Sequence, residues 1–265
     1  MVPDGGGKTV TTIPSSLEDR GRILRELGFA TRRVGEELHG SAEITPEMHV
    51  PGTSVLRTSV LATWADTTSG LLASLVMGPR VPVTLELDLH LYRPAPASGA
   101  VRAVGRTVKV GRSVFVAECE FSVDGEPIGF SAASFMVAPD PEVRFPEGLS
   151  VDLPQTGERL PVPLAERAEC ERVAPGTVML PRSVEGLNAS GTVNGGLLAL
   201  AAEESVLSLA PGSTLSFLGL RYLLGARVGP VAAEARLHDG LARVEVRDTG
   251  NDNRLTTLAT ARIFG

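Results

Sequence analysis

The feature that most constrains the fold is an order of elements that occurs twice along the chain. A helical stretch that is apolar on nearly every side, residues 53–78, is followed by four runs of alternating polar and apolar residues, and the same order returns from residue 176, with a second helical stretch at 194–210. A helix that is apolar all round must be enclosed by its domain, and alternating runs separated by turn residues predict antiparallel strands. Each half is therefore predicted to surround one long helix with strands.

Residue identities support the repeat. The helical stretches align at an offset of 137 residues (198 minus 61), which pairs Leu61, Ala62 and Ala65 with Leu198, Ala199 and Ala202. The strands that follow align at an offset of 130 (229 minus 99), which pairs Gly99, Val101, Ala103 and Arg106 with Gly229, Val231, Ala233 and Arg236. Together with the shared order of elements, these identities indicate an internal duplication.

The middle of the chain separates the two halves. Residues 139–164 contain six prolines and little periodicity, which is typical of a linker. We therefore expect an N-terminal domain over residues 1–138, this linker, and a C-terminal domain over residues 165–265. The first domain also carries a predicted helix at 15–28 and a predicted strand around 35–46.

Composition excludes several function classes. The net charge of −6 gives no broad attraction to nucleic acid or to an anionic membrane. The most apolar segments are interrupted by Asp66 or Glu203 before they reach the roughly 20 residues that a membrane span needs. Cys119 and Cys170 lack metal-like spacing and are expected to be free thiols in a reducing compartment, and no apolar signal segment begins the sequence, so a cytoplasmic protein is expected.

The residues around the second helix resemble the PaaI-type acyl-CoA thioesterases of the hotdog superfamily. That pattern has an Asn, a Gly three residues later, then His-Gly-Gly, and an Asp nine residues after the His. The second half matches its spacing, with Asn in place of His and Glu in place of Asp: Asn188, Gly191, Asn194-Gly195-Gly196 and Glu203. The first half keeps the carboxylate, Asp66, but has Pro51, Ser54 and Arg57-Thr58-Ser59 at the other positions.

The resemblance, which covers about residues 34–138 and 170–265, implies a fold. It predicts an α+β chain of two tandem hotdog domains, a double hotdog, in which a continuous antiparallel sheet wraps around two central helices. It also implies a thioester hydrolase with composite sites between the domains, an acyl-CoA substrate, no cofactor beyond the coenzyme A of that substrate, and further assembly into a homo-oligomer.

The chemistry requires two halves to build one site. Hydrolysis of a thioester needs a carboxylate to attack or activate water, and donors that stabilise the oxyanion. The free N–H of Gly195 at a helix N-terminus is such a donor. Glu203 lies eight residues further along the same helix, roughly 12 Å away, whereas reacting atoms must approach within about 3–3.5 Å. The candidate site therefore combines Asp66 with Gly195, Asn188 and Asn194, and a second, degenerate site combines Glu203 with Thr58.

Weaker candidates surround these residues. Thr67 and Ser69 follow Asp66 and could hydrogen-bond a bound water, although helix hydroxyls usually bond to their own backbone. Gly196 could let the substrate approach the backbone. By the same resemblance Arg106 and Arg112 could meet the phosphates of coenzyme A, although alternating basic residues often form a solvated strand face. The four histidines are scattered without metal-ligand spacing, and no metal is predicted.

Two other functions remain open from the sequence. The missing histidine and the altered second site suit a non-catalytic protein that binds acyl-CoA or an acyl carrier. A hotdog hydratase or dehydratase ranks last, because such relatives use a catalytic His with an acid, and none of the four histidines here has that setting.

Overall fold

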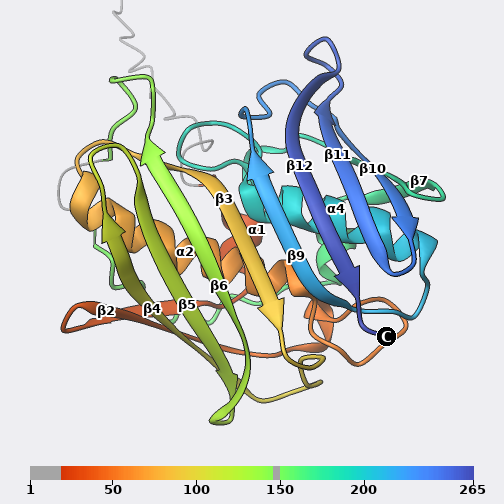
Figure 1. Cartoon of the computed structure of the whole chain (residues 1–265), viewed down its shortest axis with the longest axis horizontal. Coiled ribbons are helices and arrows are strands. Elements are labelled where there is room, and N and C mark those ends of the chain that lie inside the picture. Colours follow the sequence, from red (N-terminus) through yellow and green to blue (C-terminus); the bar gives the residue numbers. More distant parts are fainter. Residues whose placement is uncertain (1–18, 146–149) are drawn as a thin grey trace, which may run out of the picture.

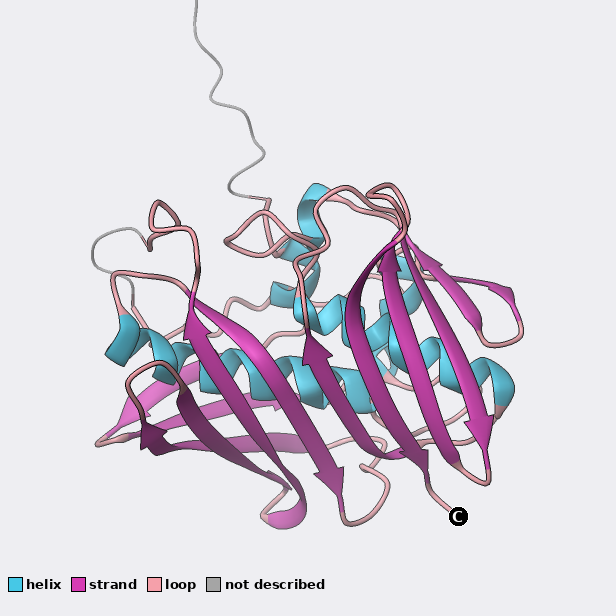
Figure 2. Cartoon of the chain, turned by 45° about the horizontal axis from the view of Figure 1, so that its top comes forward, coloured by secondary structure: helices cyan, strands magenta, loops and turns pink. Residues whose placement is uncertain are grey.

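A computed structural model describes residues 19–145 and 150–265 and confirms the predicted α+β class, a double hotdog. Twelve strands form one antiparallel sheet in the order β1-β2-β4-β5-β6-β3-β9-β12-β11-β10-β8-β7, and two long helices lie against one face of it (Figures 1 and 2). The strands of the first half are β1 (Ala30–Val34), β2 (Glu37–Glu43), β3 (Pro82–Leu91), β4 (Ala100–Val110), β5 (Phe115–Val123) and β6 (Glu126–Val137). Those of the second are β7 (Glu171–Ala174), β8 (Thr177–Leu180), β9 (Leu215–Tyr222), β10 (Val231–His238), β11 (Leu241–Asp248) and β12 (Arg254–Ile263).

The strand order records the duplication directly. Adding six to each label of the first half, β1-β2-β4-β5-β6-β3, gives the second half read inward from the opposite edge. The halves meet at β3 and β9, which pair in antiparallel register from Glu86 opposite Arg221 to His90 opposite Phe217. The two domains therefore share one uninterrupted sheet across a pseudo-twofold seam.

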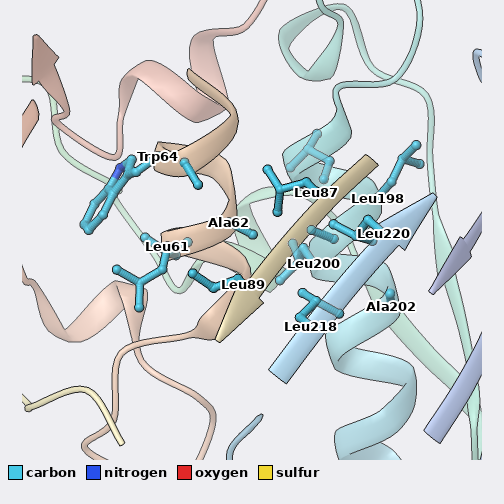
Figure 3. Close-up of a cluster of buried hydrophobic side chains, with 14 of the residues drawn as sticks. Leu61, Ala62, Trp64, Leu87, Leu89, Leu198, Leu200, Ala202, Leu218 and Leu220 are labelled. Atoms are coloured by element: carbon cyan, nitrogen blue, oxygen red, sulfur yellow. The ribbon is translucent and has the colours of Figure 1, made fainter. Parts of the chain in front are cut away.

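The long helices are α2 (Thr58–Met77) and α4 (Gly195–Leu209), whose first residues also differ by 137 (195 minus 58). Both are buried on several sides because each packs on the sheet and on the other helix. Leucines from α4, β3 and β9 gather at the seam, including Leu89, Leu200 and Leu218 (Figure 3). By length and hydropathy α2 could span a membrane, but 61% of its most apolar window is buried inside the protein, as in a core helix.

The remaining helical segments are short: α1 (Arg22–Arg25), α3 (Leu164–Arg167), and the 3-10 turns η1 (Pro46–Met48) and η2 (Val184–Gly186). The sequence predicted a helix at 15–28. Residues 15–18 lie outside the described residues, and within 19–28 only Arg22–Arg25 are helical, so the predicted helix was too long. Gly21 has a left-handed φ of 72° and Gly28 one of 64°, so the glycines bracket a single turn. The edge strands β1 and β7 were not predicted, because they lack a clear alternation of buried and exposed residues.

Residues 150–160 of the proline-rich segment lie against the first domain. Thr31 of β1 bonds to it twice as a donor, from its N–H to the Leu153 carbonyl at 2.9 Å and from its hydroxyl to the Val151 carbonyl at 2.7 Å. The side chains of Val151 and Leu160 are buried. This segment therefore adds an irregular border to the edge of the sheet.

Candidate functional site

Asp66 lies in the middle of α2 with a half-buried side chain. The Thr84 hydroxyl on β3 donates a hydrogen bond to its Oδ1 at 2.7 Å. Burial raises the pKa of the Asp66 carboxyl to about 6, although the hydrogen bond from Thr84 favours the ionised form. At neutral pH the group is thus mainly ionised, yet more basic than an ordinary aspartate.

The N-terminus of α4 presents a free backbone donor. Asn194 is the N-cap residue, and its side-chain oxygen accepts a hydrogen bond from Gly196 N–H at 2.9 Å. The N–H of Gly195 has no partner within residues 19–145 and 150–265. The helix dipole places partial positive charge at this N–H, which therefore suits an oxygen that becomes negative.

Close helix packing brings this donor toward the carboxylate. A Cβ added to Gly196 would overlap the side chain of Thr63 on α2, so the two helices are in near contact at this point. Thr63 precedes Asp66 by three residues, and residues three apart share one face of a helix. The start of α4 and the Asp66 carboxylate therefore lie beside each other, although they come from different domains.

Tyr222, at the end of β9, connects the two groups. Its hydroxyl donates a hydrogen bond to the carbonyl oxygen of Gly195 at 3.1 Å. Burial, together with the nearby negative charge of Asp66, raises the pKa of the Tyr222 phenol well above its usual value. Tyr222 and Thr84 both belong to this site, and neither was singled out from the sequence.

The second, degenerate site has the same plan but is closed. Glu203 of α4 is completely buried at the N-terminus of α2. Its Oε1 accepts hydrogen bonds from Thr58 N–H at 2.8 Å and from Ser59 N–H at 3.4 Å, and its Oε2 accepts one from the Ser59 hydroxyl at 2.6 Å. The carboxylate thus accepts from the first two N–H groups of α2, whereas at the start of α4 the N–H of Gly195 has no partner among the described residues.

An ion-pair cluster surrounds Glu203. Arg57, fully buried, lies 3.4 Å from Glu203 and 2.6 Å from Glu204, and Arg172 reaches Glu204 at 2.6 Å. Burial raises the pKa of Glu203, while the charge of Arg57 and the hydrogen bond from Ser59 act in the opposite direction. This cluster links the two domains and surrounds the start of α2 with buried charged side chains.

Asn188, a proposed member of the open site, bonds within its own loop. Its side-chain oxygen accepts from Ser190 N–H at 3.0 Å and Thr192 N–H at 3.1 Å, and its amide nitrogen donates to the Thr192 hydroxyl at 2.9 Å. These bonds shape the loop that leads into α4. Any contact with a substrate would require Asn188 to exchange one of them.

The weaker candidates occupy varied settings. The Thr67 hydroxyl donates to the Thr63 carbonyl of its own helix at 2.9 Å, while Ser69 is fully buried and its hydroxyl has no partner in the described part of the chain. Arg106 is held by Glu37 and Glu120, each at 2.7 Å, and Arg112 lies exposed after β4. The structure thus brings Asp66, Gly195, Asn194 and Gly196 together and leaves Arg106 engaged with carboxylates.

Comparison with known proteins agrees with this architecture. Residues 55–128 match the family model of the Thioesterase superfamily. No curated protein sequence matches the chain.

Three solved structures share the whole fold. The 12:0-ACP thioesterase from Umbellularia californica superposes with a TM-score of 0.61 at 14% identity, covering 88% of this chain and 99% of that one. An acyl-ACP thioesterase from Bacteroides thetaiotaomicron superposes with a TM-score of 0.59 at 16% identity, covering 85% of this chain and 98% of that one. The tesB protein of Mycobacterium avium subsp. paratuberculosis superposes with a TM-score of 0.57 at 14% identity, covering 92% of this chain and 98% of that one. The chain is a tandem hotdog protein, and its first half carries the sequence pattern of the thioesterase superfamily.

Proposed function

We propose that the protein hydrolyses acyl-CoA thioesters at the site formed by Asp66 and the N-terminus of α4. The observation that carries this proposal is the pairing of a carboxylate of raised pKa with a helix N–H from the other domain that has no partner among the described residues. These are the two groups that thioester hydrolysis needs, a base or nucleophile and an oxyanion donor.

The proposed reaction begins with the thioester carbonyl oxygen on Gly195 N–H. Asp66 removes a proton from a water molecule, and the water oxygen adds to the carbonyl carbon. The C–S bond then breaks, and the thiolate takes the proton from Asp66, which leaves a free carboxylic acid and a thiol. Alternatively, the Asp66 carboxylate attacks the carbon itself, and water then cleaves the resulting anhydride. A single turnover in 18O-labelled water tests the anhydride route, because water that attacks the aspartyl carbonyl of the anhydride leaves label in the Asp66 side chain, whereas the direct water route puts label only in the product acid.

The proposal includes one active site per chain. Glu203 holds the N–H groups of Thr58 and Ser59, so the two donors that correspond to Gly195 and Gly196 are already occupied. The change Glu203→Gln should therefore leave thioester hydrolysis intact, whereas Asp66→Asn should abolish it.

A non-catalytic binding protein is the second candidate. It is favoured by the Tyr222 ring, which fills the space beside the first residue of α4, where a side chain of Gly195 would lie. This candidate predicts that acyl-CoA raises the melting temperature without being cleaved.

The proposed setting is cytoplasmic, because Cys119 and Cys170 are both free thiols. Further assembly into a homo-oligomer is also proposed, and light scattering of the purified chain tests it.

The deciding experiment measures thiol release from short, medium, long and aromatic acyl-CoAs by the native protein, Asp66→Asn and Glu203→Gln. Acyl-carrier-protein thioesters belong in the same series, because two structural relatives are named as ACP thioesterases. Turnover that is lost only in Asp66→Asn supports the proposal. Unchanged turnover in Asp66→Asn would overturn the assignment, and binding without turnover would favour the second candidate.

A further inference from the structure

Two arginine side chains lie on the loop that leads into α4. Arg182, which follows β8, donates a hydrogen bond from Nη2 to the Gly191 carbonyl at 3.4 Å. Arg20, which precedes α1, has its Nη1 4.0 Å from the position that a Cβ of Gly191 would take. Gly191 has a left-handed φ of 72°, so the loop turns at the residue that both arginines approach. Two guanidinium groups therefore lie beside one residue, four positions before Gly195.

Neither guanidinium pairs with a carboxylate within residues 19–145 and 150–265. The acidic residues closest to them in this part of the sequence have other partners: Glu185 is held by Arg22 at 3.5 Å and by Arg167 at 2.8 Å, and Asp19 lies 4.0 Å from Arg22. The Nε of Arg20 is buried and has no hydrogen-bond partner in the same ranges. The loop thus carries positive charge that is available to an anion.

The shape of the loop does not depend on these arginines. Asn188 bonds to Thr192 twice at 2.9 Å, from its backbone N–H to the carbonyl and from its side-chain amide to the hydroxyl. Val193 N–H donates to the Ala226 carbonyl at 2.9 Å. Arg182 is exposed, and its one bond to the loop is long. Its guanidinium can therefore exchange that bond for a ligand at little cost.

A phosphate group suits this arrangement, because guanidinium groups bind phosphate oxygens through paired N–H donors. In coenzyme A, and in the prosthetic arm of an acyl carrier protein, a pantetheine unit joins the thioester sulfur to a phosphate. About thirteen bonds separate that sulfur from the phosphorus, which is the length of roughly four extended residues, about 15 Å. Gly191 is four residues from Gly195 and lies no more than about 14 Å away. An arm whose thioester lies at Gly195 is thus long enough for its phosphate to reach Gly191.

We propose that Arg20 and Arg182 bind the phosphate at the end of the pantetheine arm, an inference that rests on the proposed thioester hydrolysis. The arm then runs beside residues 188–194, with its thioester at Gly195 N–H. The two arginines bind the substrate and take no part in proton transfer. They are better placed for this role than Arg106, whose charge is already paired with two carboxylates.

The test compares two substrates that carry the same acyl group and differ only in the phosphate, acyl-4′-phosphopantetheine and acyl-pantetheine. In Arg20→Gln and in Arg182→Gln, KM for the phosphorylated substrate should rise about tenfold, with kcat changed less than about threefold. KM for acyl-pantetheine should stay within about twofold of the native value, because its arm makes no ionic contact. A merely structural effect of either change would raise both KM values together.

Arg102→Gln is the matched control, because Arg102 is exposed on β4, and it should change neither KM. Acyl-CoA and the acyl-carrier-protein thioester both carry this phosphate, so both are assayed with the native protein. The thioester with the higher kcat/KM identifies the source of the phosphate.

Binding of coenzyme A provides a readout that needs no turnover. In isothermal titration calorimetry the double variant Arg20→Gln, Arg182→Gln should bind coenzyme A at least about tenfold more weakly than the native protein does. Pantetheine, which has no phosphate, should bind equally to both proteins.

The outcomes separate this inference from the proposed function. Equal changes of KM for the two substrates, or no change in either, would overturn the role of the arginines and leave hydrolysis in place. If the native protein cleaves no thioester but the double variant loses affinity for coenzyme A alone, hydrolysis fails and the phosphate site stands in a binding protein. If the native protein neither cleaves a thioester nor binds coenzyme A, both fail.

Discussion

Glu203 is predicted to be a major contributor to stability and to play no part in catalysis. It is fully buried and accepts hydrogen bonds from Thr58 N–H, Ser59 N–H and the Ser59 hydroxyl, with Arg57 beside it. All of these donors belong to the other domain. The change Glu203→Ala therefore removes one acceptor from several donors at once and tests the contact between the domains.

The expected cost follows from the number of donors left without a partner. Each buried unsatisfied donor costs about 1–3 kcal/mol, so three of them at the lower half of that range give roughly 3–6 kcal/mol. This range includes the roughly 3–5 kcal/mol usually lost when one partner of a buried ion pair is removed. In Glu203→Ala, Arg57 still pairs with Glu204 at 2.6 Å. The loss of stability should therefore be smaller than if Arg57 were left without any partner. A loss of about 4 kcal/mol lowers the melting temperature of a chain of this size by roughly 8–16 °C.

The isosteric change Glu203→Gln should cost less, about 1–2 kcal/mol. A glutamine oxygen still accepts from Thr58 N–H and Ser59 N–H, and the Ser59 hydroxyl can turn to accept from the new amide. Only the contact with Arg57, at 3.4 Å, becomes one between two donors.

Urea unfolding and differential scanning calorimetry measure both changes. Glu234→Ala is the control, because this glutamate is exposed on β10, and its loss should shift the unfolding free energy by less than about 0.5 kcal/mol. A Glu203→Ala protein within 1 kcal/mol of the native free energy of unfolding would refute the reasoning. So would a loss of thioester hydrolysis in a folded Glu203→Gln protein.

The remaining predictions concern Asp66, Gly196 and Asp248. Because the proposed hydrolysis uses the ionised Asp66 carboxylate, kcat/KM should fall as the pH decreases through about 6, which a pH–rate profile checks. The raised pKa means that the folded state favours protonated Asp66, so the free energy of unfolding declines as the pH rises from 3.8 to about 6. At pH 8 the free energy of unfolding of Asp66→Asn should therefore exceed that of the native protein by up to about 3 kcal/mol, which urea unfolding measures. Gly196→Ala should lose about 1–3 kcal/mol against Thr63, whereas Gly70→Ala, whose Cβ would meet Phe135 at 3.5 Å, should be neutral or stabilising; thermal unfolding compares them. Asp248 is fully buried, and its carboxylate accepts hydrogen bonds from the N–H groups of residues 227–229 at 2.7–3.0 Å. Asp248→Asn should therefore speed hydrogen exchange at those amides by at least about tenfold, which corresponds to roughly 1.4 kcal/mol. Unchanged exchange would contradict this.

The large apolar helices and the alternating strands were predictable because each pattern admits one structural solution. The stretch at 194–210 became α4 (Gly195–Leu209) almost residue for residue. The stretch at 53–78 became a helix only from Thr58, because the residues before it form turns, with Val50 N–H bonded to the Val55 carbonyl at 2.9 Å. Strands β1 and β7 escaped prediction because they are short edge strands with one buried residue in β1 and none in β7, so neither shows an alternation.

The arrangement of the candidate site was predictable only for residues whose spacing lies within one helix. The spacing between Gly195 and Glu203 predicted that the carboxylate must come from the other half, and Glu203 indeed lies at the N-terminus of α2. Tyr222 could not be located in this way, since its position over Gly195 depends on how β9 lies beside α4. Whether Asn188 acts in catalysis stays a prediction.

The seam between β3 and β9 has a consequence for how activity depends on protein concentration. A site shared by two separate chains vanishes on dilution below their dissociation constant. Here both contributors belong to one polypeptide and one sheet, so the specific activity should stay constant into the nanomolar range, whatever larger assembly forms. Covalent linkage also lets the halves diverge, because a change in one is not copied into the other. One half-site could thus become a structural clamp at Glu203 while its counterpart at Asp66 kept an open donor.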